Sequence, residues 1–257
     1  MNSPSVEELG TKLARCRQRG EVAALPVDAL GSRAAAEAVQ DAAVAAYGGG
    51  RRGHKIGATN SSVQQLLGCR EPFFGPLFAQ DVLESGATFR LPRGVLGIEC
   101  EFAFVMGRAY PAANEPVSLE SLRDAVSACH LALEVVGRRV GGSVLLNEAS
   151  AIADFALDVA YVHGPGVADW RDRDLSRAPV TARVDGRPAA EGRGAEALGD
   201  PLNALLWLAR TLADRNRRLE AGDIVSTGTC TGITPVEAGR RFRGDFHDLG
   251  AVELVLA

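Results

Sequence analysis

The sequence has no closely spaced cysteine pair, no long apolar run and no long basic run. Its five cysteines stand far apart, outside any Cys-x-x-Cys motif: Cys16, Cys69, Cys100, Cys129 and Cys230. Neither a disulfide framework nor a zinc knuckle is therefore predicted. Without a long apolar run we expect no membrane-spanning segment. The arginine pairs Arg51-Arg52 and Arg240-Arg241 are short, and the net charge is −4, so we expect no nucleic-acid partner.

The first eight residues are acidic and have no apolar core behind them, so we expect no signal peptide and a cytoplasmic protein. The chain of 257 residues is 46% hydrophobic and 23% charged. This composition is typical of one large globular domain, or of a core with a small helical lobe.

Helical signals concentrate near the N-terminus. Ser5 and Glu8 form a capping-box pattern before a helical run that Gly20 ends, and Ser32 can cap a second, alanine-rich helix. We predict an N-terminal helical region over residues 1–50 and one structural unit over residues 51–257. The clearest helix of the second part begins at Asp200-Pro201, and most of the remainder is strand-like.

The most informative stretch is the apolar run Gly97–Gly107, which carries two carboxylates. Strand side chains alternate between faces, so Glu99 and Glu101 would share one face, roughly 6.5–7 Å apart. If water does not reach them, a proton or a cation must relieve their repulsion. The plain alternative is a strand end whose glutamates face water or pair with arginines.

A third acid, Glu134, is the only one in the alternating stretch His130–Val136. Three carboxylates without a nearby Cys or His suit Mg²⁺ or Mn²⁺ better than zinc. Such a cation would keep coordination positions for water and for an oxygen-rich substrate, and would polarise a 2-oxo acid.

Two other stretches could line a site. Lys55 stands between Gly53 and Gly57, which would permit close approach to a ligand, although most lysines are solvated. Glu71–Phe78 holds three aromatics and two prolines, which favours a rigid pocket wall or a core-covering loop over a regular element. Near the C-terminus several hydroxyls could bind a carboxylate or simply form a turn: Ser226, Thr227, Thr229 and Thr231.

Six motifs in order resemble the 2-keto-4-pentenoate hydratase branch of the fumarylacetoacetate hydrolase superfamily, from about residue 40 to residue 256. They are Lys55-Ile56-Gly57-x-Thr59, Phe74-Gly75 with Leu77-Phe78, Glu99-x-Glu101, Leu133–Val136 with Arg139, Ile152-Ala153-Asp154, and Gly222–Val225 with Thr227-Gly228. The resemblance implies an α+β, mostly β fold, a mixed β-roll or barrel with an N-terminal helical region. It also implies a homo-oligomer.

For the site, the resemblance implies Mg²⁺ or Mn²⁺ on Glu99, Glu101 and Glu134, with Lys55 as a catalytic group. The expected activity is that of a lyase on a 2-oxo or 2-hydroxy-dienoic acid, through a metal-bound enolate, most simply a hydratase of aromatic catabolism. An acylpyruvate-type hydrolase or a 2-oxo acid decarboxylase would share that intermediate. A family member that binds a small acid without turnover is the remaining alternative.

The remaining site assignments also come from the resemblance. Glu71 is the nearest acid to the step where the family has a second proton shuttle, because Phe73 occupies that step. The expected substrate contacts are Phe73, Phe74, Arg139, Asp154, Phe155, Thr227, Gly228 and Thr229. Phe73, Phe74, Phe155 and Leu157 replace polar family residues, so we predict preference for a monocarboxylic 2-oxo acid with an apolar tail.

Overall fold

A computed structural model describes residues 4–257 of the chain. The α-helices are α1 Val6–Arg19, α2 Arg33–Tyr47, α3 Ser61–Leu67, α4 Leu119–Ala125, α5 Glu148–Ala153 and α6 Pro201–Ala213. The strands are β1 Arg51–Gly57, β2 Phe73–Phe78, β3 Val82–Glu84, β4 Thr88–Phe89, β5 Val95–Met106, β6 Val126–Gly137, β7 Asp158–Gly166, β8 Pro179–Val184, β9 Arg187–Arg193, β10 Ile224–Thr229, β11 Arg241–Asp245 and β12 Ala251–Leu256. No helix within 4–257 has the length and apolar character needed to cross a membrane.

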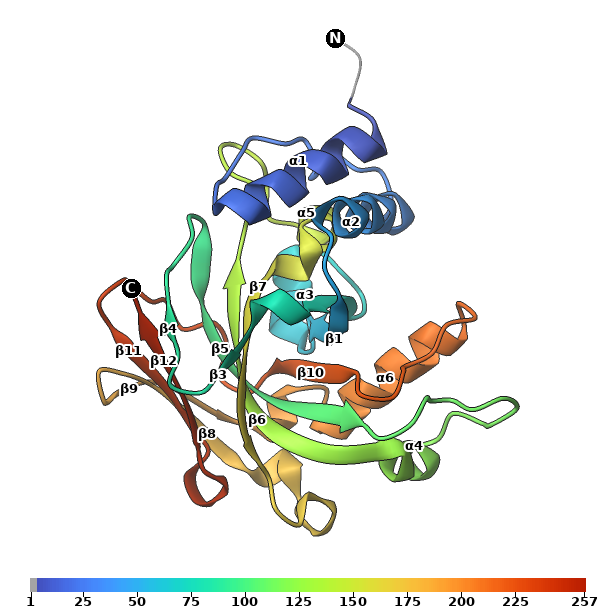
Figure 1. The fold of residues 1–257 in the computed structure, drawn as a ribbon, viewed down its shortest axis with the longest axis vertical. Coiled ribbons are helices and arrows are strands. Elements are labelled where there is room, and N and C mark those ends of the chain that lie inside the picture. The colour runs from blue at the N-terminus through green and yellow to red at the C-terminus, as the bar shows by residue number, and fades with distance from the viewer. Residues whose placement is uncertain (1–3) are drawn as a thin grey trace.

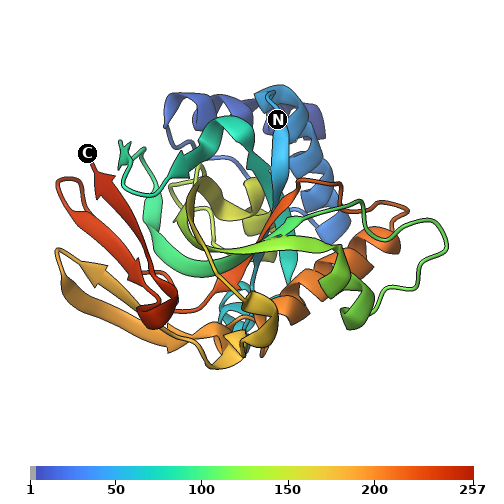
Figure 2. The same ribbon diagram turned by 60° about the horizontal axis from the view of Figure 1, so that its bottom comes forward.

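The strands of the described residues form two sheets. A seven-stranded sheet has the order β2-β1-β10-β5-β6-β7-β3, and a five-stranded sheet has the order β4-β12-β11-β8-β9. Figures 1 and 2 show that the long strands β5 and β6 bend strongly and that β11 and β12 lie at one side of the molecule. The predicted α+β architecture with curled, mixed sheets and N-terminal helices is confirmed.

Local sequence signals explain where the main helices begin and end. Ser5 and Glu8 form the reciprocal capping box, and Gly20 ends α1 in the left-handed conformation at φ 64°. Asp200 caps α6 by accepting a hydrogen bond from the Leu202 amide at 2.8 Å, and Pro201 occupies the first helical position.

The N-terminal helices share an apolar core with later parts of the chain. Leu13 and Ala43 belong to the same buried cluster as Ile152 and Phe155, and Figure 1 shows α1 and α2 above α5. The Gln40 side chain also donates a 2.7 Å hydrogen bond to the Ile152 carbonyl. Residues 6–47 therefore pack directly against the region that follows β6.

The two faces of β5 have different neighbours. Ile98, Cys100 and Phe102 point into the larger core, which also receives the apolar stripe of α6. On the opposite face, Ala103 belongs to a small apolar cluster with Leu77, Ala132, Tyr161 and Ile224. Glu99 and Glu101 share that second face, so the sheet places their carboxylates next to an apolar floor.

One expectation was wrong. Phe73–Phe78 forms the regular strand β2, antiparallel to β1, where a pocket wall or loop was predicted. Pro76 is tolerated because β2 lies at the edge of its sheet, where a missing N–H need not break a ladder. The prolines and aromatics therefore obscured a strand that regular alternation would otherwise have shown.

Candidate metal-binding active site

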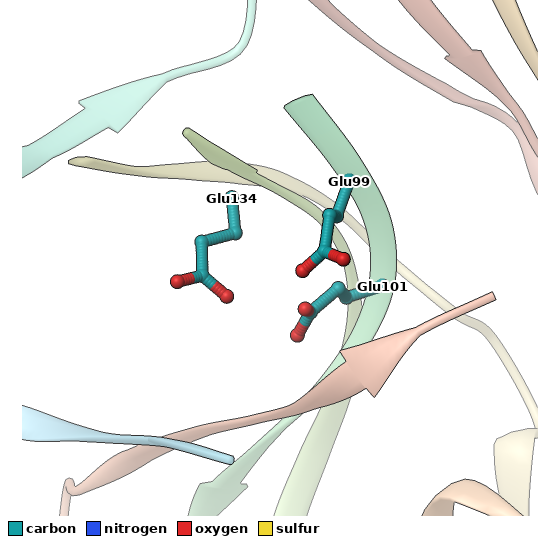
Figure 3. Close-up of side chains that lie close together, drawn as sticks. All are labelled: Glu99, Glu101 and Glu134. Atoms are coloured by element: carbon teal, nitrogen blue, oxygen red, sulfur yellow. The ribbon is translucent and has the colours of Figure 1, made fainter. Parts of the chain in front are cut away.

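Glu99, Glu101 and Glu134 form a cluster on the face of β5 and β6 that carries the small apolar floor. Glu99 lies directly opposite Glu134 in the antiparallel register, and Glu101 is two residues further along β5. Each residue offers a carboxylate oxygen within 4.8 Å of those of the other two. Figure 3 shows the three carboxyl groups directed toward one another. We call these three residues the glutamate cluster.

The glutamate cluster is buried, and its carboxyl groups resist ionisation as a consequence. Burial, followed by the charge of Glu134, raises the pKa of Glu99 to about 7 against the opposing effect of Lys55. Burial and the charge of Glu99 likewise raise the pKa of Glu101 to about 7. Burial raises the pKa of Glu134 well above its ordinary value. The protein alone therefore stabilises three negative charges poorly here.

Hydrogen bonds orient one oxygen of Glu101 and leave other oxygens available. Ser226 Oγ donates to Glu101 Oε2 at 2.5 Å, and the Gly228 amide donates to the same oxygen at 2.9 Å. Within residues 4–257, Glu101 Oε1 and Glu134 Oε2 are buried without a hydrogen-bond partner. Buried carboxylate oxygens without partners fit a hard divalent cation, which prefers oxygen ligands.

Lys55 reaches the glutamate cluster from β1. Its Nζ lies 2.9 Å from Glu134 Oε1 and donates a 3.0 Å hydrogen bond to the Ala156 carbonyl. Burial by itself lowers the pKa of Lys55, but the charges of Glu134, Glu99 and Glu101 outweigh it and raise the pKa. The structure therefore places a charged ammonium beside the cluster.

The carbonyl that holds Lys55 belongs to an unusual turn. Phe155, Ala156 and Leu157 all have positive φ, at 54°, 54° and 67°. Three successive non-glycine residues in the left-handed region are strained, so the surrounding contacts must hold them. This turn, residues 155–157, contacts β1 and β2 of the seven-stranded sheet.

Arg139 and Asp154 brace the turn at residues 155–157. Arg139 Nε is 2.5 Å from Asp154 Oδ1, and the Arg139 amide donates to Asp154 Oδ2 at 2.6 Å. The remaining guanidinium nitrogens donate to the carbonyls of Asp158, Asp154 and Gly137. Both side chains are buried and bonded to protein atoms, so their predicted contact with substrate has no support in this arrangement.

The three predicted aromatic contacts take different positions. Phe73 lies opposite Gly57 on the Lys55 side of β1 and β2 and is 2% exposed. Phe74 lies on the other side, where it packs against His54 and Trp207. A side chain on that side of the sheet does not face the glutamate cluster.

Phe155 is fully buried and packs edge-to-face against the Tyr47 and Phe78 rings. The guanidinium groups of Arg17 and Arg139 stack on its ring, with centroid distances of 4.9 and 5.4 Å. The ring therefore anchors the turn at residues 155–157 to the N-terminal helices.

Some of the C-terminal residues predicted to bind a carboxylate contact the glutamate cluster, and others bond to the backbone. Thr227 Oγ1 donates to the Phe102 carbonyl at 2.8 Å. Thr229 lies opposite Glu101 in the register, and its Oγ1 accepts hydrogen bonds from the Thr231 and Gly232 amides. A side-chain hydrogen bond from Thr229 to Glu99 also lowers the pKa of Glu99, against the larger effect of burial. Gly228 contributes its amide to Glu101, and its φ of 98° favours glycine there.

Glu71 lies outside this group. Its side chain is 60% exposed and forms a 2.8 Å ion pair with Arg33 of α2. The structure therefore gives no support to its predicted part in proton transfer.

Sequence reasoning missed a buried ion-pair group next to the turn. Arg17 lies 2.7 Å from Asp81 and 2.6 Å from Asp158, although its position in the last turn of α1 is typical of a solvated residue. The partners are separated from Arg17 by 64 and 141 positions, so no local pattern could have joined them.

These observations define the class of the protein: its curled mixed sheet carries a buried site made of three carboxylates and a lysine. Residues 50–256 match the family model "Fumarylacetoacetate (FAA) hydrolase C-terminal", and the chain belongs to this family. Its relatives include the 2-keto-4-pentenoate hydratase of Paraburkholderia xenovorans (strain LB400), which is 36% identical over 208 residues, 79% of this chain and 76% of the relative.

A second relative and one solved structure extend the comparison. The TodF product hydratase of Pseudomonas putida F1 is 35% identical over 211 residues, 81% of this chain and 78% of the relative. The structure of 4-oxalocrotonate decarboxylase from Pseudomonas putida G7, complexed with magnesium and adipate, superposes with a TM-score of 0.88 at 23% identity. It covers 98% of this chain and 97% of the decarboxylase, which shows that the two share a fold.

Proposed function

We propose that this protein is a divalent-metal-dependent hydratase of a short 2-oxo or 2-hydroxy-dienoic acid, of the 2-keto-4-pentenoate type. The observation that carries the proposal is the buried glutamate cluster with Lys55 at 2.9 Å from Glu134. Family membership and the names of relatives at 35–36% identity support the reaction type.

Glu99, Glu101 and Glu134 would hold the cation, Mg²⁺ or Mn²⁺. The fit rests on the available buried oxygens of Glu101 and Glu134 and on the all-carboxylate donor set. When bound, the cation supplies Lewis-acid polarisation of the substrate's 2-oxo or 2-enol oxygen. It also offsets the mutual repulsion of the carboxylates.

Lys55 is the group of this chain that handles charge and protons at the substrate. Glu134 and the Ala156 carbonyl fix its ammonium group. In that position it stabilises negative charge as it develops on the substrate oxygen, and it can donate a proton when water adds to the remote double bond. Ser226 and the Gly228 amide keep Glu101 in place during this change.

The direct test supplies purified protein with Mg²⁺ or Mn²⁺ and 2-hydroxypenta-2,4-dienoate, and follows the loss of dienoate absorbance and the product by mass. We expect a hydrated product and loss of activity with EDTA. Release of CO₂ from a 2-oxo diacid, or cleavage of an acylpyruvate without hydration of the dienoate, would replace the hydratase by a decarboxylase or a hydrolase. Metal-loaded protein without turnover on all three substrates would favour the binding alternative.

Further properties belong to the same proposal. The family match begins at residue 50, which supports a division into a helical region, residues 1–50, and a catalytic unit, residues 51–257. We also propose a homo-oligomer and a role in aromatic catabolism, as the family resemblance implies, and a cytoplasmic location. Light scattering of the purified protein tests the oligomer, and a monomer mass would end that part of the proposal.

A further inference from the structure

A small pocket lies on the side of β1 that faces away from Lys55. Its volume is about 110 Å³, and residues of α2, β1, β2 and the segment after α6 surround it. Gly75, the register partner of Lys55, lines it together with His54. The pocket is thus separate from the glutamate cluster, although the strand that carries Lys55 borders it.

His54 is the most deeply buried polar side chain of this pocket. It is 2% exposed, and neither ring nitrogen has a hydrogen-bond partner among the described residues. Burial, together with the charges of Arg51 and Arg217, lowers the pKa of His54 to about 3. The ring is therefore neutral near pH 7 and offers one N–H donor and one acceptor. A buried polar group without a partner is costly, which points to a ligand with matching polar atoms.

The positive charges around the pocket are not all paired with a nearby negative charge. Arg215 is bonded to Glu37 at 2.9 Å. Arg51 has only a distant partner, Asp223 at 3.8 Å. The guanidinium of Arg217 has no hydrogen-bonded or ion-pair acceptor within residues 4–257. Two arginines are thus left to attract an anion.

Two carboxylates line the pocket, Glu37 and Asp41, and Glu37 is already paired with Arg215. Burial raises the pKa of Asp41 from its ordinary value. An ionised Asp41 accepts hydrogen bonds but donates none. It would repel an oxyanion without protons and would bind the O–H of a protonated one.

We propose that this pocket binds a small tetrahedral oxyanion that keeps a proton, with hydrogenphosphate as the simplest member. Arg51, Arg217 and the His54 N–H donate to its oxygens, and its O–H donates to Asp41. The volume matches about three to four water molecules, enough for one such ion and too small for a nucleotide. The proposal is independent of the hydratase reaction.

An open cleft lies next to the pocket. Its volume is about 670 Å³, and it shares Arg51 and Arg217 with the inner pocket. Arg218 and Glu220 line only the outer cleft and are bonded to each other at 3.0 Å. Arg51 and Arg217 therefore line both spaces.

The test compares two dianions of the same shape at about pH 8, above the second ionisation of phosphate. Titration calorimetry of the purified chain with inorganic phosphate, and separately with sulfate at equal ionic strength, measures both affinities. We expect phosphate to bind at least about tenfold more tightly, because only phosphate donates to Asp41. Asp41→Asn should reduce that preference to within about threefold, since an amide also donates.

Two further variants and one spectroscopic signal locate the binding. Arg217→Gln should weaken phosphate at least about tenfold, while Arg218→Gln, the matched control in the outer cleft, should leave the affinity unchanged. In the unmodified protein, the ring ¹⁵N resonances of His54 should shift as phosphate is added. Absence of phosphate binding, equal affinity for sulfate, a His54 signal that does not move, or full affinity in Arg217→Gln would each overturn the proposal.

Discussion

Lys55 and Glu134 form an ion pair of 2.9 Å between side chains that are almost wholly buried. The pair joins two strands of the seven-stranded sheet that are not neighbours, because β10 and β5 lie between β1 and β6. A charge pair inside a protein costs desolvation that good geometry must offset. Since Glu134 also belongs to the glutamate cluster, the pair is better explained by the chemistry of the site than by stability.

Glu101→Gln should remove most of the affinity for the metal while the fold survives. Neutralising one of three clustered acids lowers their repulsion, and it also removes an anionic oxygen ligand. We expect Mn²⁺ to bind at least about a hundredfold more weakly in calorimetry, with an unchanged or higher melting temperature without metal. Glu253→Gln, at an exposed ion pair with Arg243, is the control. Unaltered Mn²⁺ affinity in Glu101→Gln would remove this residue from the metal site.

Lys55→Met should lower kcat more than it changes KM. A group that acts on charge developing in the transition state contributes to kcat, and a general acid typically contributes about 10²–10⁴-fold. The variant leaves Glu134 without the ammonium group of Lys55. The melting temperature of the metal-loaded variant must therefore be measured together with its kinetics. A well-folded variant with full kcat would show that Lys55 has no role in the chemical step.

Arg139→Met tests whether the arginine braces the turn at residues 155–157 or binds substrate. Breaking its buried pair with Asp154 should cost about 3–5 kcal/mol of the free energy of unfolding. Arg138→Met is the control, since Arg138 makes a single side-chain bond to the Val144 carbonyl and should cost less than about 1 kcal/mol. Urea titrations give both values. A stable Arg139→Met protein with a raised KM would restore the substrate-binding role.

The sequence alone predicted the features that depend on residues a few positions apart. The caps at Ser5 and Asp200 and the alternation around Glu99 and Glu101 are written within a few residues, and each appears in the structure. The pairing of Glu99 with Glu134 is not local: strand alternation offered Glu134 only as a candidate third ligand, and the family resemblance assigned all three carboxylates to one site. The opposite positions of Phe73 and Phe74 follow from strand alternation, which the two prolines nearby concealed.

His54 should make stability depend on pH in a predictable direction. Its pKa is about 3 in the folded protein and 6.5 ordinarily, so the unfolded chain binds the proton more readily. The stability that a neutral His54 contributes is complete above pH 6.5 and is lost as the pH falls toward 3. His54→Leu removes this dependence.

Urea unfolding in phosphate-free buffer measures the difference. Between about pH 8 and about pH 5, the free energy of unfolding of the unmodified protein should fall by about 2 kcal/mol more than that of His54→Leu. Parallel pH profiles for the two proteins would show that His54 takes up a proton in the folded state as easily as in the unfolded chain.

The last prediction concerns the substrate's tail. A second carboxylate on the substrate would need a cation, and the arginines that could approach from the end of β6 are already engaged: Arg139 donates to Asp154 and to three carbonyls, and Arg138 donates to Val144. An unpaired carboxylate in a buried site costs several kcal/mol, whereas each buried CH₂ contributes about 0.8 kcal/mol, close to fourfold in binding. We therefore expect kcat/KM for a monocarboxylic 2-oxo dienoate with an alkyl or aryl tail to exceed that of the matched diacid at least about tenfold. Steady-state kinetics on the pair decides the matter, because a tenfold preference for the diacid would require Arg138 or Arg139 to leave its present partners and face the tail.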